Sequence, residues 1–321
     1  MTTLFTGGPI RTGAGDRVAD WVTVEGDRIL GVGMRDDMPS ADHSVDLGGA
    51  TLVTAFRDAH VHLPATGLYA TGLDFRGETS AAAITRAFAA RASSGGDPLL
   101  FGGNFEDPLD EPLEGAQLDA AVGERPALLA RADMHSAIVS SALLAQLDVG
   151  DLQGVDRDAE GRPTGYLREQ AAAEAWRWFD ANLSKEQQRD AVTAAVRLAY
   201  SKGVVEVHEM FVVEWRGWNA AEAFAEIIEP FALDVRLFLG TDDVDRVRHI
   251  GHPRIGGDYF LDGSFGSHTA WMQQPFVSLP SGGSPATGIS YRDDDHLLDF
   301  FLEAQSAGLQ VGVHAIGDAA I

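Results

Sequence analysis

Cysteine is absent from this chain of 321 residues, and lysine occurs only twice, as Lys185 and Lys202. Without cysteine there are no disulfides, no thiolate metal ligands and no cysteine nucleophile. Any metal ion must therefore be held by His, Asp or Glu side chains.

Long apolar runs are missing too. The longest have the length of a strand, far short of the roughly 20 residues that a membrane-spanning helix needs. Residues 1–10 contain neither the basic cluster nor the apolar stretch of a secretory signal. We therefore expect a cytoplasmic protein with no membrane partner.

Positive charge is scarce. The formal net charge is −24, from 48 acidic and 24 basic side chains. Such a field repels nucleic acid phosphates and anionic lipid surfaces, so nucleic acid is not expected as a partner. The expected partner is a small-molecule substrate, and a homodimer is left open.

The remaining composition, 45% hydrophobic and 22% charged, is that of a globular protein. Short β-strands are predicted over residues 21–25, 28–32 and 44–47, with a tight hairpin turn at Gly26 and Asp27. These strands predict a small β-domain over residues 1–53.

From residue 51 onward, strands alternate with helices. Ser184 and Gln187 predict the start of a helix through reciprocal capping, and Gly203 predicts its end before a strand over 204–207. The other strands are predicted at 51–56, 127–130, 233–239, 259–261 and 309–313, and the other helices at 79–92, 170–179 and 293–307. Repeated strand–helix units predict an α/β fold over residues 54–321, a TIM-type (β/α) barrel.

Metal-competent residues cluster where these strands end. His60 and His62 flank Val61, and side chains two residues apart on an extended chain point to the same side. Both imidazoles can therefore face one metal ion. His or acidic residues also follow other predicted strands: His208, Glu209, Asp262, His268 and His314. Because barrel active sites lie at the carboxyl ends of the strands, this placement favours a catalytic site.

Several segments resemble the amidohydrolase superfamily, and among its subgroups amidohydrolase family 3, metal-dependent hydrolases related to N-substituted formamide deformylase. The first is DAHVHL at residues 58–63. The others are RADMHSA at 131–137, PTGYLRE at 163–169, GVVEVHEM at 203–210, DGSFGS at 262–267 and HAIGD at 314–318. They occur in the family's order over essentially the whole chain.

The resemblance implies a (β/α)₈ barrel beside a small β-sandwich, with one or two divalent metal ions, most simply zinc. Carried over by position, His60, His62 and His314 are metal ligands, and His135 and Glu169 lie near the substrate. The implied chemistry is hydrolysis of a non-peptide C–N bond by a metal-activated water.

Asp258 stands where relatives carry a lysine that can be carboxylated to bridge two metals. Neither lysine of this chain replaces it easily, because Lys202 precedes its strand. Asp258 is therefore a candidate ligand, with Glu206 or Glu209 as the other possible carboxylates. Glu209 is also a candidate substrate contact.

Only five barrel strands are accounted for before Ile321. In the family a further histidine and a general-base aspartate follow, so the catalytic base is expected beyond Ile321 and the chain is expected to be a fragment. Two alternatives stay open: ester or phosphoester hydrolysis on the same scaffold, and a catalytically inactive small-molecule-binding barrel.

Overall fold

A computed structural model describes the chain except residues 14, 96–97, 151 and 278–285. It divides into two compact units, residues 1–57 with 203–205, and residues 58–202 with 206–321. No helix in the described part of the chain is both long and apolar enough to cross a membrane.

The first unit is built from short strands. Its four-stranded sheet has the order β5-β4-β1-β6, in which β4 pairs antiparallel with both β1 and β5. The strands are β1 (Thr2–Thr6), β4 (Trp21–Glu25), β5 (Arg28–Gly33) and β6 (His43–Asp46), beside a ribbon of β2 (Ile10–Arg11) and β3 (Val18–Ala19) and the short helix η1 (Arg35–Asp37). Gly26 has a φ of 58° in the β4–β5 turn, which confirms the predicted hairpin.

The larger sheet of the second unit has the order β12-β13-β11-β10-β9-β8. Strands β8, β9 and β10 run parallel, and β11, β13 and β12 are added to β10 by antiparallel pairing. The strands are β8 (Leu73–Asp74), β9 (Leu100–Phe105), β10 (Ala127–Arg131), β11 (Ser136–Val139), β12 (Val155–Arg157) and β13 (Pro163–Arg168). The accompanying helices are α2 (Ala81–Ser94), α3 (Gly115–Val122), α4 (Ser141–Leu144) and α5 (Glu169–Asn182).

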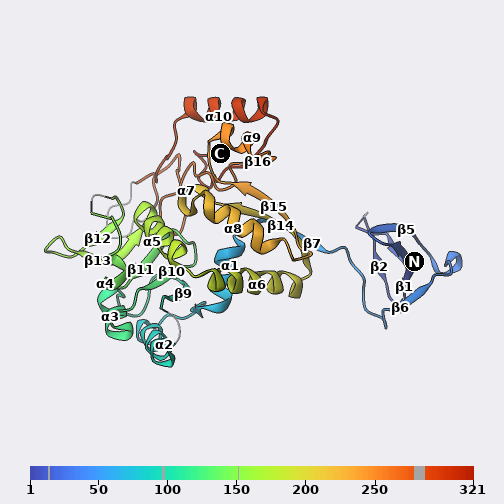
Figure 1. Cartoon of the computed structure of the whole chain (residues 1–321), viewed down its shortest axis with the longest axis horizontal. Helices are drawn as coiled ribbons and strands as arrows, with labels where there is room; N and C mark the ends of the chain where they lie inside the picture. The colour runs from blue at the N-terminus through green and yellow to red at the C-terminus, as the bar shows by residue number, and fades with distance from the viewer. Residues whose placement is uncertain (14, 96–97, 151, 278–285) are drawn as a thin grey trace. The chain divides into compact units, whose positions relative to one another are not determined.

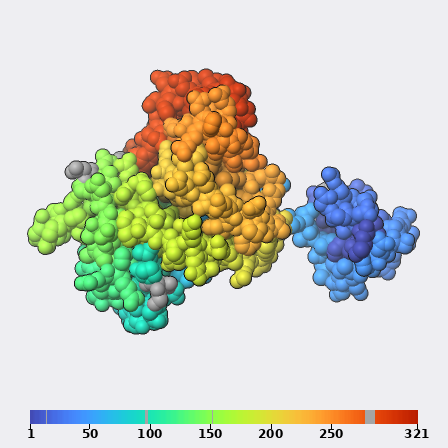
Figure 2. Space-filling view, in the orientation of Figure 1, coloured from blue at the N-terminus to red at the C-terminus, as the bar shows by residue number. Residues whose placement is uncertain are grey.

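The other sheet has the order β17-β16-β15-β14-β7, and β14 to β17 run parallel. Its strands β7, β14, β15 and β16 are labelled in Figure 1. Its strands are β7 (Phe56–Val61), β14 (Val204–Phe211), β15 (Asp234–Leu239), β16 (Arg254–Ile255) and β17 (Gln310–Val311). The helices are α1 (Leu63–Thr71), α6 (Lys185–Ser201), α7 (Val213–Arg216), α8 (Trp218–Ile228), α9 (Val244–His249) and α10 (Asp294–Ser306). The second unit is thus an α/β assembly with a curled parallel half-barrel. Figure 2 shows its surface as continuous, from the segments of the first sheet to those of the second.

Helix α6 starts as predicted. The Ser184 hydroxyl accepts a hydrogen bond from the Gln187 backbone N–H, and the Gln187 side chain accepts one from the Ser184 N–H. Helix α6 packs closely on α1, because Gly67 of α1 has no side chain: a Cβ there would lie 1.8 Å from the Ala191 carbonyl oxygen. This contact fixes the helix that directly follows the two β7 histidines.

Three predicted strands differ from the structure. The strand predicted at 51–56 is β7 and covers residues 56–61, so the His-x-His motif lies on the strand and at its end. Residues 259–261 form only a single bridge, Phe260 to His314, and the strand predicted at 309–313 is reduced to β17. Gly256 and Gly257 have φ values of 86° and 65°, which turn the chain directly after β16 and prevent a longer strand.

Candidate metal centre

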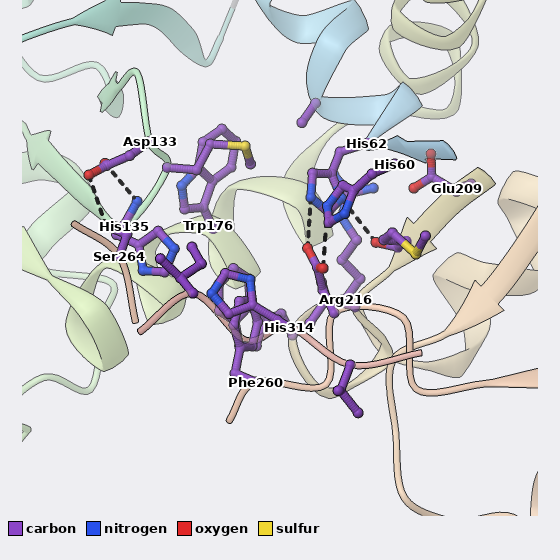
Figure 3. A pocket seen from close by; sticks show the side chains of 18 of the residues that line it. His60, His62, Asp133, His135, Trp176, Glu209, Arg216, Phe260, Ser264 and His314 are labelled. Atoms are coloured by element: carbon purple, nitrogen blue, oxygen red, sulfur yellow. Dashed lines mark hydrogen bonds and ion pairs between the residues drawn. The ribbon is translucent and has the colours of Figure 1, made fainter. Parts of the chain in front are cut away.

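A cavity of about 450 Å³ lies in the second unit, where β7, β14 and the segment around residue 258 meet. Among the residues predicted for the site, six line it: His60, His62, His135, Glu209, Asp258 and His314 (Figure 3). Glu169 lines a neighbouring cavity, and Glu206 lines neither. The sequence-based selection therefore converges on one place in the fold.

Three of these side chains form a compact group. Nε2 of His60 lies 3.3 Å from Oδ1 of Asp258, and Nε2 of His62 lies 2.9 Å from Oδ2 of the same carboxylate. In the described part of the chain, these three residues are the group that could hold a metal ion, with ligand atoms within 4.8 Å of one another. Asp258 is almost fully buried, with 4% of its surface exposed.

The donor set fits a cation better than it fits hydrogen bonds alone. Nδ1 of His62 lies 3.0 Å from the Met210 carbonyl oxygen, which can only accept, so Nδ1 carries the proton. Nε2 of a neutral His62 then directs a lone pair at a carboxylate oxygen, and two acceptors face each other. Oδ1 of Asp258 is also buried without a hydrogen bond among the described residues. A cation between these atoms would resolve both conflicts.

Electrostatics keep the carboxylate ionised. When no metal is bound, protons on the facing nitrogens of His60 and His62 take the place of a cation. Burial opposes ionisation of Asp258, but the contacts with these two imidazoles then outweigh it and hold the pKa of Asp258 well below its usual range. Asp258 in turn raises the pKa of His60 against the opposing effect of burial.

Glu209 supports the corner that carries the histidines. Its carboxylate is fully buried, and Oε2 accepts a hydrogen bond of 2.5 Å from the backbone N–H of Leu63, the first residue of α1. Burial raises the pKa of Glu209 to about 7. Glu209 thus fixes the start of α1 directly after His62, and it can exchange a proton near neutral pH.

His314 reaches the cavity from the C-terminal segment but is not part of the three-residue group. Its Nε2 lies 3.1 Å from the carbonyl oxygen of Gly263, so this nitrogen donates and Nδ1 keeps the lone pair. Burial lowers the pKa of His314, which favours the neutral imidazole. Asp262, buried nearby, accepts hydrogen bonds from the backbone N–H groups of Ile316 and Gly317 and so fixes the turn after His314.

His135 and Glu169 form a pair on the opposite wall. Nδ1 of His135 lies 3.1 Å from Oε2 of Glu169, and Glu169 also accepts hydrogen bonds from Tyr291 and Thr269. Burial opposes protonation of His135, but Glu169 outweighs it and raises the pKa of His135. The rings of His135 and His314 are 5.7 Å apart, which places this pair beside the candidate ligands.

The structure adds lining residues that the sequence did not single out. Trp176 is buried, and its indole N–H has no hydrogen-bond partner among the described residues. Asp180 forms a two-point ion pair with Arg216. Asp133 accepts hydrogen bonds from Arg131 and from the hydroxyls of Ser264 and Ser267. Asp133 lies in a segment quoted for the family resemblance, whereas Trp176 and Asp180 belong to no motif and carry no sequence signal beyond their helix.

Comparison with known proteins decides the family. A family model described as the amidohydrolase family matches residues 44–321. The chain belongs to the amidohydrolase family. The predicted family and fold class are therefore confirmed.

Two curated relatives match most or all of the chain. A protein described as putative amidohydrolase YtcJ, from Bacillus subtilis, is 29% identical over 100% of this chain and 64% of its own length. The Arabidopsis thaliana protein LONG AFTER FAR-RED 3 is 26% identical over 94% of this chain and 56% of its own length. The chain thus spans less than two thirds of the length of these curated relatives.

Solved structures agree with this assignment. An uncharacterized metal-dependent hydrolase from Pyrococcus furiosus is 25% identical with a TM-score of 0.72, covering 100% of this chain and 68% of that one. A second, from Pyrococcus horikoshii, is 24% identical with a TM-score of 0.74, covering 100% of this chain and 66% of that one. This amidohydrolase-family chain is therefore similar in fold to known metal-dependent hydrolase structures.

Proposed function

We propose that this amidohydrolase-family protein hydrolyses a non-peptide C–N bond of a small molecule, with a water activated by a divalent metal ion. The observation that carries the proposal is the facing of His62 Nε2 and the ionised Asp258 carboxylate, a pair of acceptors that a cation would join. His60 completes this group, and His314 supplies a further imidazole in the same cavity.

Zinc is the metal that suits this donor set best, because it binds neutral imidazole and carboxylate ligands in four-coordinate sites. When bound, such an ion lowers the pKa of a water molecule and polarises a carbonyl group. The chain's own residues orient the imidazole ligands and neutralise the positive charge of the ion. Met210 fixes the tautomer of His62, and Asp258 supplies negative charge.

Proton transfer is assigned to buried groups of the same cavity. Glu209, with a pKa of about 7, can take up or release a proton near neutral pH. His135, held by Glu169, has a raised pKa and can donate from Nε2, the nitrogen that does not face the carboxylate. A departing amine needs such a proton, which favours hydrolysis of an amide-type bond.

The phosphoester alternative has less support. Both arginines beside the cavity are already paired, Arg216 with Asp180 and Arg131 with Asp133. Beyond a bound metal ion, a phosphoryl group would meet acidic side chains and no unpaired arginine among these two to compensate the rest of its charge. The inactive-barrel alternative predicts a chain that retains no metal.

Elemental analysis of protein purified without chelators tests the metal centre. We expect at least about one zinc ion per chain in the wild type, and we expect His60→Ala to lose most of this zinc. The matched control is His249→Ala, an exposed histidine on α9. Unchanged metal content in His60→Ala would refute the assignment. A hydrolysis screen over N-acyl, formamide, cyclic imide and ester substrates then tests the bond type.

A further inference from the structure

A second cavity of about 220 Å³ adjoins the candidate metal centre. The two cavities share three lining residues, His135, Trp215 and Phe260. At about 30 Å³ per water molecule, the second cavity has room for about seven waters, or for a substituent the size of one ring. No residue of the candidate metal group lines it.

Helix α5 is a common wall of both cavities. Glu169 and Ala173 line the second cavity, and Trp176 and Asp180 line the first. These positions are four, three and four residues apart, so they share one face of the helix. A molecule lying along this face would pass from one cavity into the other.

Flat aromatic surfaces mark the junction. The rings of Trp215 and Phe260 are stacked, with centroids 4.8 Å apart and an interplanar angle of 14°. Both rings line both cavities, and Tyr291 lines the second one. Such surfaces favour a planar group, which stacks on aromatic rings.

Charge in the second cavity is weighted toward acceptors. Glu214 receives both of its contacts from one nitrogen of Arg292, at 3.1 and 3.0 Å, and therefore keeps further lone pairs. Glu169 and His135 also line this cavity, but they pair with each other. This leaves Glu214, beside Arg292, as the acceptor that faces an incoming group. An anionic substituent is therefore disfavoured, and a cation or hydrogen-bond donor is favoured.

We propose that the second cavity is a substrate subsite for a planar substituent that carries a positive charge or hydrogen-bond donors. The proposal rests on the proposed function in one respect, since the substituent belongs to the molecule whose C–N bond would be cleaved beside His60 and His62. The scissile bond then lies near Trp176, and the substituent passes the Trp215–Phe260 stack toward Glu214.

Calorimetric binding of three ring-bearing probes tests the subsite without requiring hydrolysis. Benzylamine and benzyl alcohol have the same shape and differ in charge, and phenylacetate carries the opposite charge. We expect benzylamine to bind about threefold more tightly than benzyl alcohol, which corresponds to a partly exposed ion pair, and phenylacetate to bind most weakly. Equal affinities for all three would overturn the assigned charge preference.

Two variants locate the binding. Ala173→Leu fills the second cavity from α5 and is expected to weaken benzylamine binding at least about tenfold. Glu214→Gln is expected to abolish the preference for benzylamine over benzyl alcohol. Benzylamine binding that persists unchanged in Ala173→Leu would place the probe elsewhere and sink the proposal. If Ala173→Leu does not fold, Ala173→Val gives the same readout with a smaller side chain.

The outcomes separate this proposal from the proposed function. If no amide is hydrolysed but the probes and variants behave as expected, the subsite stands and the catalytic assignment fails. If amides with and without a ring substituent are hydrolysed equally, and Ala173→Leu changes neither, the catalytic assignment stands and the subsite fails. Melting temperature and metal content of each variant confirm that the rest of the molecule is intact.

Discussion

Nε2 of His62 lies 2.9 Å from Oδ2 of Asp258, although the two residues are 196 positions apart in the chain. The contact joins the end of β7 to the turn that follows β16. Since Nδ1 of His62 faces a carbonyl oxygen, the side of the ring that faces Asp258 carries the lone pair. The geometry thus directs two acceptors at one point, where a cation would join them.

Asp258→Asn removes the negative charge and keeps the shape of the side chain. We expect zinc affinity to fall by at least about tenfold, the lower end of what loss of a supporting outer partner costs. A competitive zinc titration measures this. Asp245→Asn is the matched control, because Asp245 is exposed and pairs with Arg248 on the same helix, away from the candidate metal group. Equal zinc affinities in the two variants would remove Asp258 from the metal centre.

Lys202 is expected to play no part in metal binding. Lys202 is the C-cap of α6 and precedes the first residue of β14. Met210, whose carbonyl oxygen contacts His62 at the candidate metal centre, lies six residues after that first residue, which is about 20 Å along an extended strand. Lys202→Ala should therefore keep its metal content, and added bicarbonate, the source of a lysine carbamate, should not raise activity. A bridging carbamate would be shown by two results together. Lys202→Ala would lose its metal, and added bicarbonate would raise the activity of the wild type.

Much of this centre could be predicted from local sequence patterns. The spacing of His60 and His62 depends only on the two-residue period of a strand, and the α6 start depends on the Ser184–Gln187 exchange. Asp258 was identified only by its position in the family resemblance. The preceding Gly256 and Gly257 indicate a turn, but they do not show that the turn brings Asp258 to the two β7 histidines.

Other features depend on long-range packing that no local pattern encodes. Glu169 was expected near the substrate, but its φ of 46° and its hydrogen bonds to Tyr291 and Thr269 depend on segments more than 90 residues away. The second cavity arises where α5, α7 and residues 291–292 meet. Sequence patterns of the separate segments do not show that they enclose a space.

Glu209 makes stability depend on pH in the metal-free protein. Its pKa is raised from 4.5 to about 7 by burial, so the folded state holds a proton that the unfolded state releases above pH 4.5. The contribution of Glu209 to the free energy of unfolding is therefore present in full below pH 4.5 and is lost as the pH rises through 7. The rise from 4.5 to about 7 corresponds to about 3 kcal/mol.

Glu209→Gln should remove this pH dependence. Denaturant unfolding with chelator present, compared at pH 5 and pH 8, measures the change in the free energy of unfolding. We expect the variant to lose less stability than the wild type over this interval, and exposed Glu226→Gln to behave as the wild type does. Parallel pH profiles for Glu209→Gln and the wild type would show that Glu209 is not the group responsible.

Trp176 is expected to position the substrate through its indole N–H. This donor is buried in the wall of the main cavity and has no hydrogen-bond partner among the residues that the structure describes, and in Figure 3 the ring lies between His135 and the β7 histidines. A buried donor without a partner costs free energy in the unliganded protein, and a substrate acceptor that meets it recovers that cost. Trp176→Phe removes the donor and keeps an aromatic ring.

For a hydrolysed amide, we expect Trp176→Phe to raise KM about threefold to tenfold, the equivalent of one neutral hydrogen bond. The kcat should change less, because the contact serves binding in both the ground state and the transition state. Trp178→Phe, on the same helix and outside the lining of the main cavity, is the matched control for losing an indole. A purely structural role would lower the melting temperature and leave KM unchanged, and that result would reject the assignment.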